Sequence, residues 1–151
     1  MRAVIQRVTE ASVLVADYYK SIGLGYLILL GIHVDDTDID YDYMLKKIIA
    51  LRVFEDSEGK MNLSLSQVNG SILLISQFTL LGSVKGNNRP SFTQSAKPDQ
   101  ALAYYERLYT DLKKVVPVVE KGVFGEDMKI SLINQGPVTI IIDTKEWFYE
   151  E

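Results

Sequence analysis

Apolar residues gather into short runs, some alternating with polar residues and some wholly apolar, and most of these runs lie in the first and last thirds of the chain. Such runs are typical of β-strands, because successive side chains of a strand point to opposite faces. Glycine, asparagine and aspartate separate several of them, as expected for turns. The predicted strands are residues 4–8, 11–15, 26–32, 61–65, 72–78, 118–120, 128–132 and 138–142.

Two segments between these runs repeat their apolar residues at the spacing of a helix. Thr37, with Asp40 three positions later, has the pattern of a capping box, so we expect a helix from there to about Leu51. Pro98 suits the first turn of a second helix, which should end before Pro117. The strands and the two helices are grouped rather than strictly alternating. This order predicts an α+β fold with a mainly antiparallel, barrel-like sheet.

The size and composition of the chain are those of an ordinary globular protein. A length of 151 residues with 47% hydrophobic content is enough for one core, so we expect a single domain over residues 1–151. No run of about 18 apolar residues is present and the N-terminus lacks a secretory pattern, so we expect a cytoplasmic protein without a membrane span. The absence of cysteine excludes disulfides, thiolate catalysis and cysteine-bound zinc.

An acidic stretch at residues 35–42 is a candidate metal site, but it fails the pattern of a calcium loop. Counting from Asp36, Tyr41 stands where glycine is required and Lys47 stands where a bidentate glutamate is required. The helix dipole already explains acidic residues at a helix start. The single histidine, His33, lies at a predicted strand end with no nucleophile-elbow sequence. We therefore expect no metal, no cofactor and no histidine base.

Two short polar segments beside apolar strands carry the candidate chemistry, because loops held by rigid strands often carry function. The first consists of Ser76, Gln77, Phe78 and Thr79, after the apolar run 72–75. No base stands beside Thr79 to activate it as a nucleophile. We expect the backbone N–H groups of Gln77 and Phe78 to stabilise an oxyanion and the Thr79 hydroxyl to orient water or substrate. The alternative is that the segment only satisfies a strand end.

The second segment, residues 134–139, contains the dipeptide of Gly136 and Pro137. Glycine permits a close approach of backbone to a ligand, and proline fixes the local geometry. The pair can therefore present carbonyl oxygens rigidly at a pocket. Only about 5–6% of X-Pro bonds in folded proteins are cis, so this argument by itself favours the trans form.

The net charge of −4 argues against a protein that binds a long stretch of nucleic acid backbone, because such binding draws on clustered lysine and arginine. A protein that binds only the end of an RNA needs few phosphate contacts. Lys85, Arg89 and Lys97 lie in the longest predicted loop, residues 82–97, and are the candidates for a small basic patch.

Taken in order, these motifs resemble the D-aminoacyl-tRNA deacylase family, homodimeric enzymes that remove D-amino acids from mischarged tRNA. The matching segments cover almost the whole chain, and they are residues 2–11, 29–31, 76–80, 88–92, 124–129 and 134–139. Three features depart from the family pattern. Gln135 replaces a more usual aspartate, Asn87 with Asn88 lengthens the stretch before Arg89, and the hairpin at residues 17–25 bears two tyrosines.

The resemblance implies hydrolysis of the ester between the terminal ribose of tRNA and a D-amino acid, or glycine on a noncognate tRNA, without a cofactor or metal. It implies that the bond between Gly136 and Pro137 is cis and enters the partner subunit's active site. There its carbonyl oxygens would capture the substrate's α-amino group, and an L side chain would collide with the backbone. The 2′-hydroxyl of the tRNA is expected to help activate water.

The resemblance also assigns roles to individual residues and leaves two rivals open. The catalytic residues would be Ser76, Gln77, Phe78 and Thr79; the substrate-binding residues Arg7, Met128, Asn134, Gly136 and Pro137; and the tRNA-binding residues Lys85, Arg89 and Pro90. Arg7 would brace the Gly-Pro segment of the partner. The rivals are a non-catalytic module that binds RNA ends and an editing enzyme for glycine or an L-amino acid. The tail, residues 146–151, is expected to dock onto the dimer or domain surface.

Overall fold

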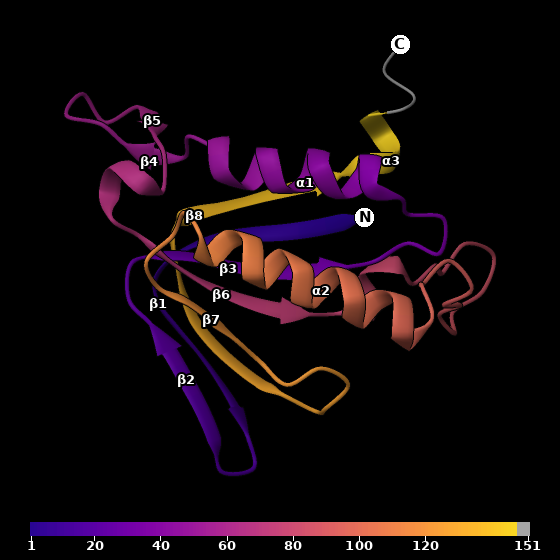
Figure 1. The fold of residues 1–151 in the computed structure, drawn as a ribbon. Helices are drawn as coiled ribbons and strands as arrows, with labels where there is room; N and C mark the ends of the chain where they lie inside the picture. The colour runs from indigo at the N-terminus through magenta and orange to yellow at the C-terminus, as the bar shows by residue number, and fades with distance from the viewer. Residues whose placement is uncertain (148–151) are drawn as a thin grey trace.

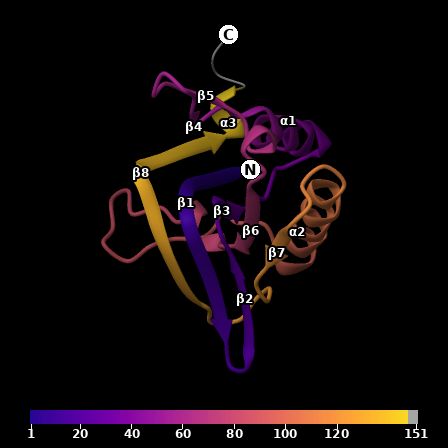
Figure 2. The same cartoon turned by 90° about the vertical axis from the view of Figure 1, so that its left-hand side faces the viewer.

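A strongly curved sheet with two long helices on its open side forms the body of the molecule (Figure 1, Figure 2). The structure is a computed structural model that describes residues 1–147. The strands are β1 (Arg2–Val15), β2 (Tyr18–Ile22), β3 (Gly25–Gly31), β4 (Phe54–Glu55), β5 (Met61–Leu63), β6 (Ser71–Ser76), β7 (Val119–Lys121) and β8 (Lys129–Asp143). The helices are α1 (Asp38–Ala50), α2 (Pro98–Lys113) and α3 (Thr144–Trp147), with 3-10 turns η1 (Ser66–Val68) and η2 (Phe78–Leu81).

β1 is the centre of the six-stranded sheet, because its length lets it pair with three strands. One of its edges pairs with β2 and β3 and the other with β8, all in antiparallel fashion. β3 pairs with β6, and β6 with β7, in parallel. The predicted α+β class and the mainly antiparallel, barrel-like sheet are confirmed, and the two parallel pairings, of β3 with β6 and of β6 with β7, are additions to that prediction. Parallel neighbours need long crossover connections, so a local pattern does not reveal them.

Two pairs of predicted strands each form one longer strand in the structure. One further strand, β2, lacks the apolar pattern by which a strand is predicted. The predicted strands 4–8 and 11–15 are both parts of β1. The predicted strands 128–132 and 138–142 belong to β8 together with the residues between them. β2 was expected only as part of a hairpin; three of its five residues are exposed, which removes the apolar signal.

A bulge interrupts the pairing of β1 with β8. Gln6 lies opposite Thr139 and Val8 lies opposite Asn134, so the residues between Asn134 and Thr139 face Arg7 alone. Extra residues in one strand of a pair bend that strand and expose it to other contacts. The bulge contains Gly136 and Pro137.

Apolar side chains pack on both faces of β3 and β6. Ile28 and Leu74 belong to the larger cluster, which also contains residues of α1 and α2. Leu27 and Leu73 belong to a second cluster, which contains residues of the β1–β2 hairpin and is contacted by the first residues of β8. Because both faces are covered, these two strands are almost continuously apolar in sequence.

Both predicted helices are confirmed, and the first begins with the predicted capping box. The Thr37 hydroxyl accepts a hydrogen bond from the Ile39 N–H at 3.3 Å, and the Asp40 carboxylate accepts one from the Thr37 N–H at 2.9 Å. Within residues 1–147, no helix is long and apolar enough to cross a membrane. The predicted docking of the tail concerns residues that, from 148 onwards, lie outside the described part of the chain.

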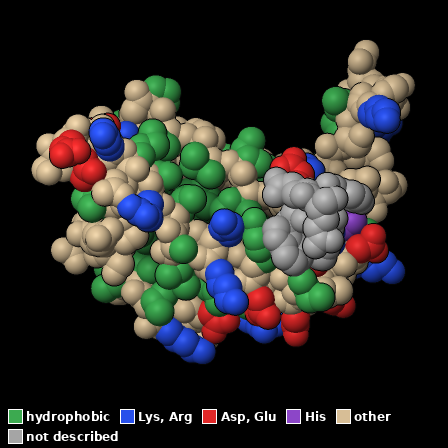
Figure 3. All heavy atoms as spheres, turned by 90° about the horizontal axis from the view of Figure 1, so that it is seen from above, with side chains coloured by type: hydrophobic (Ala, Val, Ile, Leu, Met, Phe, Trp, Pro, Cys, Tyr) green, Lys and Arg blue, Asp and Glu red, His purple; other side chains and the backbone are tan. Residues whose placement is uncertain are grey.

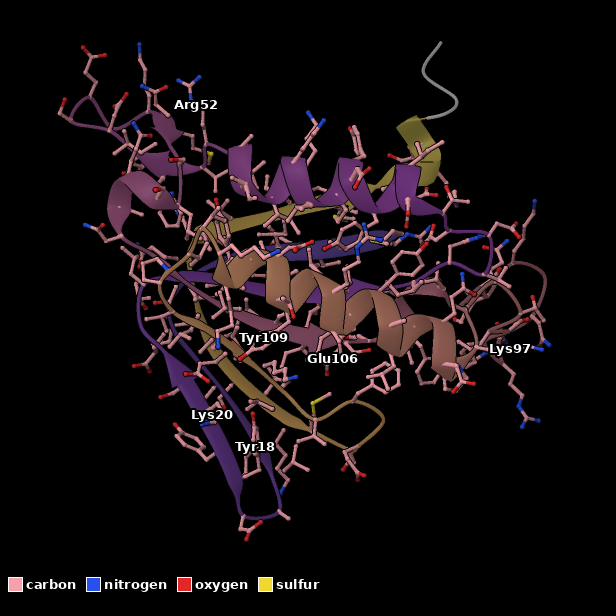
Figure 4. The ribbon with its side chains drawn as sticks, in the orientation of Figure 1. Tyr18, Lys20, Arg52, Lys97, Glu106 and Tyr109 are labelled. Atoms are coloured by element: carbon pink, nitrogen blue, oxygen red, sulfur yellow. The ribbon has the colours of Figure 1, made fainter. Side chains whose placement is uncertain are left out.

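Side chains close the gap between the outer strands β2 and β7, which do not pair. The Tyr18 hydroxyl donates to the carbonyl oxygen of Lys121 at 2.7 Å. The Lys121 ammonium lies 2.7 Å from a carboxylate oxygen of Glu106 and 4.4 Å from the ring centroid of Tyr109. Figure 4 shows Tyr18, Glu106 and Tyr109 converging between α2 and the hairpin. The Tyr18 hydrogen bond therefore joins β2 to β7 across the gap, and the Lys121 side chain joins β7 to α2.

The acidic residues before α1 and in its first turn form ion pairs and hydrogen bonds within the protein. Asp36 pairs with the α-amino group of Met1 at 2.6 Å, with both groups buried. Asp38 pairs with Arg107 of α2 at 2.7 Å. Asp40 accepts hydrogen bonds from Thr37 and from the Thr144 hydroxyl. These three carboxylates join α1 to the N-terminus, to α2 and to α3.

Candidate active site

A cavity of about 790 Å³ opens between the end of β6, η2, the first turn of α2 and the segment that precedes β8. It is lined by residues 75–79, Phe92, Ser95, Ala96, Pro98, Ala101, residues 124–128 and Ile130. Most of these side chains are apolar. The polar ones are Ser76, Gln77 and Thr79 from the end of β6 and η2, Ser95 from the loop before α2, and the carboxylates Glu126 and Asp127 from the segment before β8. An apolar cavity with a few convergent polar groups is the usual form of a small-molecule site.

All four residues predicted to be catalytic line this cavity together with Met128. Ser76 is the last residue of β6, and Phe78 and Thr79 begin η2. The Gln77 side-chain amide donates to the Thr79 hydroxyl at 3.0 Å. Because this hydroxyl already accepts a hydrogen bond, its own proton remains free to be donated toward a ligand.

The proposed use of the Gln77 backbone N–H as an oxyanion donor is wrong. That N–H donates to the carbonyl oxygen of Leu30 at 2.8 Å, which extends the pairing of β6 with β3 by one residue. An N–H bonded within the sheet is not available to a substrate. Of the two backbone donors predicted, the N–H of Phe78 is the remaining candidate, while Gln77 acts through its side chain on Thr79.

Several contacts fix η2 at the edge of the cavity. The Ser95 hydroxyl donates to the carbonyl oxygen of Phe78 at 3.1 Å. Gly31 packs against Leu81 so closely that a Cβ atom there would overlap the Leu81 side chain. A Cβ atom on Gly82 would lie 2.8 Å from the Phe92 ring. The sequence places small residues where η2 meets its neighbours, and this close packing holds the turn in place.

Aromatic residues shape two sides of the cavity. The Phe78 ring is 55% exposed and meets the Phe92 ring edge-on, with 5.1 Å between centroids. On the inner side, Phe124 lies 6.0 Å from Tyr105, whose hydroxyl donates to the Leu74 carbonyl oxygen at 2.8 Å. Burial raises the pKa of Tyr105, so this hydroxyl stays protonated as a donor.

The segment with Gly136 and Pro137 lies in the bulge of β8 and is held by its own chain. The peptide bond between the two residues is cis, as the resemblance implies. Arg7, buried and only 5% exposed, donates to the carbonyl oxygens of Gln135 at 3.0 Å and Val53 at 2.8 Å. Arg7 thus holds this segment within its own chain, and its predicted role on the partner's segment stays a prediction.

Asn134 completes the bracing of this bulge. Its side-chain oxygen accepts from the Val138 N–H at 2.8 Å, and its amide nitrogen donates to the Thr139 hydroxyl at 3.0 Å. Residues 135–137 are exposed. Within the described residues, no residue from 134 to 138 lines the cavity that contains Thr79. One chain therefore presents the two predicted halves of the site in separate places.

The predicted tRNA-binding residues form a third group. Lys85, Arg89 and Pro90 are exposed on the loop between η2 and α2, which projects from the body in Figure 1 and Figure 2. Ser83 and Ser91 pair at the base of this loop. Lys97 precedes the cavity-lining Pro98, at the start of α2. None of the three predicted residues lines the cavity itself.

Phe92, Ser95, Phe124 and Ile130 also line the cavity, although the predicted site did not include them. Phe92 and Ser95 lie in the loop between η2 and α2, where apolar residues do not recur at a regular spacing. Phe124 lies in the loop between β7 and β8, and Ile130 lies at the start of β8. Only the packing of the loop 82–97 against the segment before β8 brings them together. The family motifs contain Phe92 and Phe124, which was the one available signal.

Comparison with known proteins identifies the family. A family model described as D-Tyr-tRNA(Tyr) deacylase matches residues 4–143. The chain belongs to this family. It is therefore an enzyme, a hydrolase of the deacylase family, and the resemblance drawn from its motifs is confirmed.

Relatives of known name agree over nearly their whole length. The D-aminoacyl-tRNA deacylase of Thermoanaerobacter pseudethanolicus is 49% identical over 149 residues, which cover 98% of this chain and 100% of the relative. The D-aminoacyl-tRNA deacylase of Cytophaga hutchinsonii is 49% identical over 147 residues, 96% of this chain and 98% of the relative.

Two solved structures share the fold. The c-Myc DNA unwinding element binding protein superposes with a TM-score of 0.88 at 39% identity, covering 95% of this chain and 98% of that chain. A probable eukaryotic D-amino acid tRNA deacylase superposes with a TM-score of 0.82 at 21% identity, covering 93% and 97%. The second comparison speaks for the fold alone.

Proposed function

We propose that this deacylase hydrolyses the ester bond of D-aminoacyl-tRNA and releases the free D-amino acid and tRNA. The observation that carries the proposal is the cavity, because it gathers residues 76–79 and Met128 in a chain of this family. Aminoacyl-tRNA as the substrate would place the enzyme in the cytoplasm. The acceptor end is the only part of the tRNA that must reach the cavity, which is compatible with the net charge of −4.

The cavity supports ester hydrolysis without a histidine or cysteine base. The Thr79 hydroxyl, held by Gln77, would donate to an oxygen of the ester or orient the attacking water. The N–H of Phe78 would stabilise the oxyanion. The family resemblance assigns water activation to the 2′-hydroxyl of the terminal ribose, next to the ester, and His33 does not line this cavity.

Chiral selection is assigned to the segment of Gly136 and Pro137 acting in the partner's cavity. Its carbonyl oxygens would bind the α-amino group of the substrate, and an L side chain would collide with this backbone. The exposure of residues 135–137 and their separation from the cavity of the same chain support this arrangement. Glycine has no side chain to collide, so glycine on a noncognate tRNA would also be hydrolysed.

The surface beside the bulge supports a homodimer. Within residues 1–147, β8 pairs with β1 along one edge and no strand pairs with its other edge. Ile133 is 50% exposed and Ile141 is 67% exposed on this strand. Figure 3 shows hydrophobic side chains gathered on the face seen from above. Tyr43, Leu51 and Ile141 line a shallow groove between α1 and β8. An exposed edge strand with apolar side chains favours association with a second chain.

Hydrolysis of D-tyrosyl-tRNA and L-tyrosyl-tRNA, measured side by side with the purified protein, tests this function. We expect rapid loss of the D-ester and persistence of the L-ester. Cleavage of both esters would favour an editing enzyme without a chiral filter. Survival of both, with retained binding of the acceptor end, would favour the non-catalytic module.

A further inference from the structure

Arg2, at the start of β1, connects the end of β8 to the catalytic turn η2. Its Nη1 atom donates to the carbonyl oxygen of Leu80 at 2.6 Å. Its Nε and Nη2 atoms lie 2.9 Å and 2.8 Å from Oδ2 of Asp143, the last residue of β8. Leu80 is in η2, directly after Thr79.

The contact with Leu80 lies at a point where a short turn needs a donor. The last carbonyl groups of a helical turn have no partner inside it, and a cation near that end is favourable. At the other end of η2, the residue that precedes the turn, Gln77, makes no side-chain capping hydrogen bond. Arg2 thus donates to a carbonyl near the C-terminal end of the turn whose first two residues, Phe78 and Thr79, line the cavity.

The contact of Arg2 with the Leu80 carbonyl is distinct from its ion pair with Asp143. The strand ladder already places Arg2 opposite Asp143, so their pairing is not needed to set the register. The side chain of Arg2 is 36% exposed and that of Asp143 is 9% exposed, so water reaches this ion pair from the Arg2 side and weakens its contribution to stability. A guanidinium is a planar fork with fixed donor directions, so Asp143 orients it and the third donor points at Leu80.

We infer that Arg2 is a positioning residue for the deacylation, which sets the orientation of η2 through the Leu80 carbonyl. The inference rests on the proposed placement of the reaction in the cavity that contains Thr79. Arg2 does not touch the substrate in this account. A small rotation of η2 moves the Thr79 hydroxyl and the Phe78 N–H together, and a displacement of about 1 Å at a reacting group can cost on the order of a hundredfold in rate.

Arg2→Met tests this role, because methionine keeps an unbranched chain and loses the three donors. We expect kcat for D-tyrosyl-tRNA to fall about tenfold to a hundredfold, with KM within about threefold of the unsubstituted enzyme. The melting temperature should stay within about 4 °C. Asp143→Asn, which weakens the orienting partner, should produce a smaller loss of kcat in the same direction.

Arg107→Met is the matched control. Arg107 also pairs with an aspartate, at 2.7 Å from Asp38, and its guanidinium lies 4.1 Å from the Tyr41 ring centroid. Both of these contacts are with α1 and not with η2, so kcat should be unchanged. Equal kcat in the Arg2→Met variant and the unsubstituted enzyme, or a loss that only follows the unfolded fraction, would overturn the inference.

Amide NMR signals keep this inference separate from the proposed function. In Arg2→Met the backbone signals of Thr79 and Leu80 should shift, whereas in Arg107→Met they should not. If the unsubstituted enzyme fails to hydrolyse D-tyrosyl-tRNA, the proposed function is wrong, while the NMR comparison still decides whether Arg2 orients η2. Unchanged signals for both residues would overturn the inference on their own.

Discussion

Single hydrogen bonds decide what each residue near the cavity can do. The Thr79 hydroxyl accepts from the Gln77 amide, which fixes its oxygen and leaves its proton for a ligand. The Gln77 N–H is bound to Leu30 and cannot serve the reaction. The Arg7 guanidinium donates to the Gln135 carbonyl and so holds the bulge of β8 against β1.

Replacing Thr79 by valine tests the role of its hydroxyl. Valine keeps the branched shape but can neither donate to the ester nor accept from Gln77, so we expect kcat for D-tyrosyl-tRNA to fall about tenfold or more. Thr79→Ser, which keeps the hydroxyl, is the matched control and should stay within about threefold. Equal rates for Thr79→Val and the unsubstituted enzyme would show that the hydroxyl takes no part.

Replacing Arg7 by methionine should destabilise the protein. The buried carbonyl oxygen of Val53 would lose its donor, and a buried polar group left without a partner costs about 1–3 kcal/mol, whereas water can replace the donor at the exposed Gln135. We expect the free energy of unfolding in urea to fall by about 1–3 kcal/mol. A loss below about 0.5 kcal/mol would mean that water replaces the guanidinium at no cost.

Asp40 gives the stability a defined dependence on pH. Burial opposes its ionisation, but hydrogen bonds from Thr144, the Thr37 N–H and Lys145 outweigh that effect and lower the pKa of its carboxyl group. A carboxyl whose pKa is lower in the folded state stabilises the fold above its unfolded pKa, about 3.9, and this contribution is lost as the pH falls through the folded pKa.

The free energy of unfolding should therefore decrease between about pH 5 and pH 3, and the decrease should be smaller in Asp40→Asn, which has no carboxyl group to protonate. Urea unfolding at three pH values across this range provides the measurement. Parallel pH profiles for the two proteins would assign the acid sensitivity to other carboxylates.

Residue roles could be predicted from sequence where the partner is local. The capping box of Thr37 and Asp40 spans three positions and was found. The hydrogen bond from Gln77 to Leu30 spans the sheet, so the backbone donor was misassigned. A role for Arg7 as a brace follows only from the family resemblance, because the Gln135 carbonyl that it contacts within the chain lies in a strand far along the sequence.

At the scale of elements, the packing of strands explains both the successes and the errors of prediction. β3 and β6 are buried on both faces, and their apolar runs were recognised. Their parallel pairing depends on a crossover through α1 and the β4–β5 ribbon, which a hydrophobic pattern does not encode. The predicted break in β8 marks its bulge, where polar residues interrupt a strand that continues on both sides.

Replacing Tyr18 by phenylalanine tests how the sheet is closed. The Tyr18 hydroxyl bonds the Lys121 carbonyl across the gap between β2 and β7. Its loss should cost about 1 kcal/mol in the free energy of unfolding and leave the cavity intact. Tyr19→Phe, at an exposed position of the same strand, is the control. Equal stabilities of the two variants would show that this bond does not hold the barrel closed.

At the scale of the whole molecule, the separation of the cavity from the bulge is the central feature. The same chain holds Thr79 in one place and exposes Gly136 in another, and it leaves the free edge of β8 beside the bulge. Sequence motifs predict both halves, and the family resemblance assigns the bulge to the partner's cavity. The proposed function therefore requires two chains for each complete site.

Mixing two inactive forms of the enzyme tests this requirement most directly. One form carries Gln77→Ala with Thr79→Val in the cavity. The other carries Gly136→Ala, where the backbone φ is +132° and an added Cβ would lie 2.8 Å from Val138. After subunit exchange, mixed dimers would contain one intact cavity facing one intact bulge, so activity on D-tyrosyl-tRNA should return to roughly a quarter of the unsubstituted level. A mixture that stays as inactive as its two components would contradict a site shared between subunits.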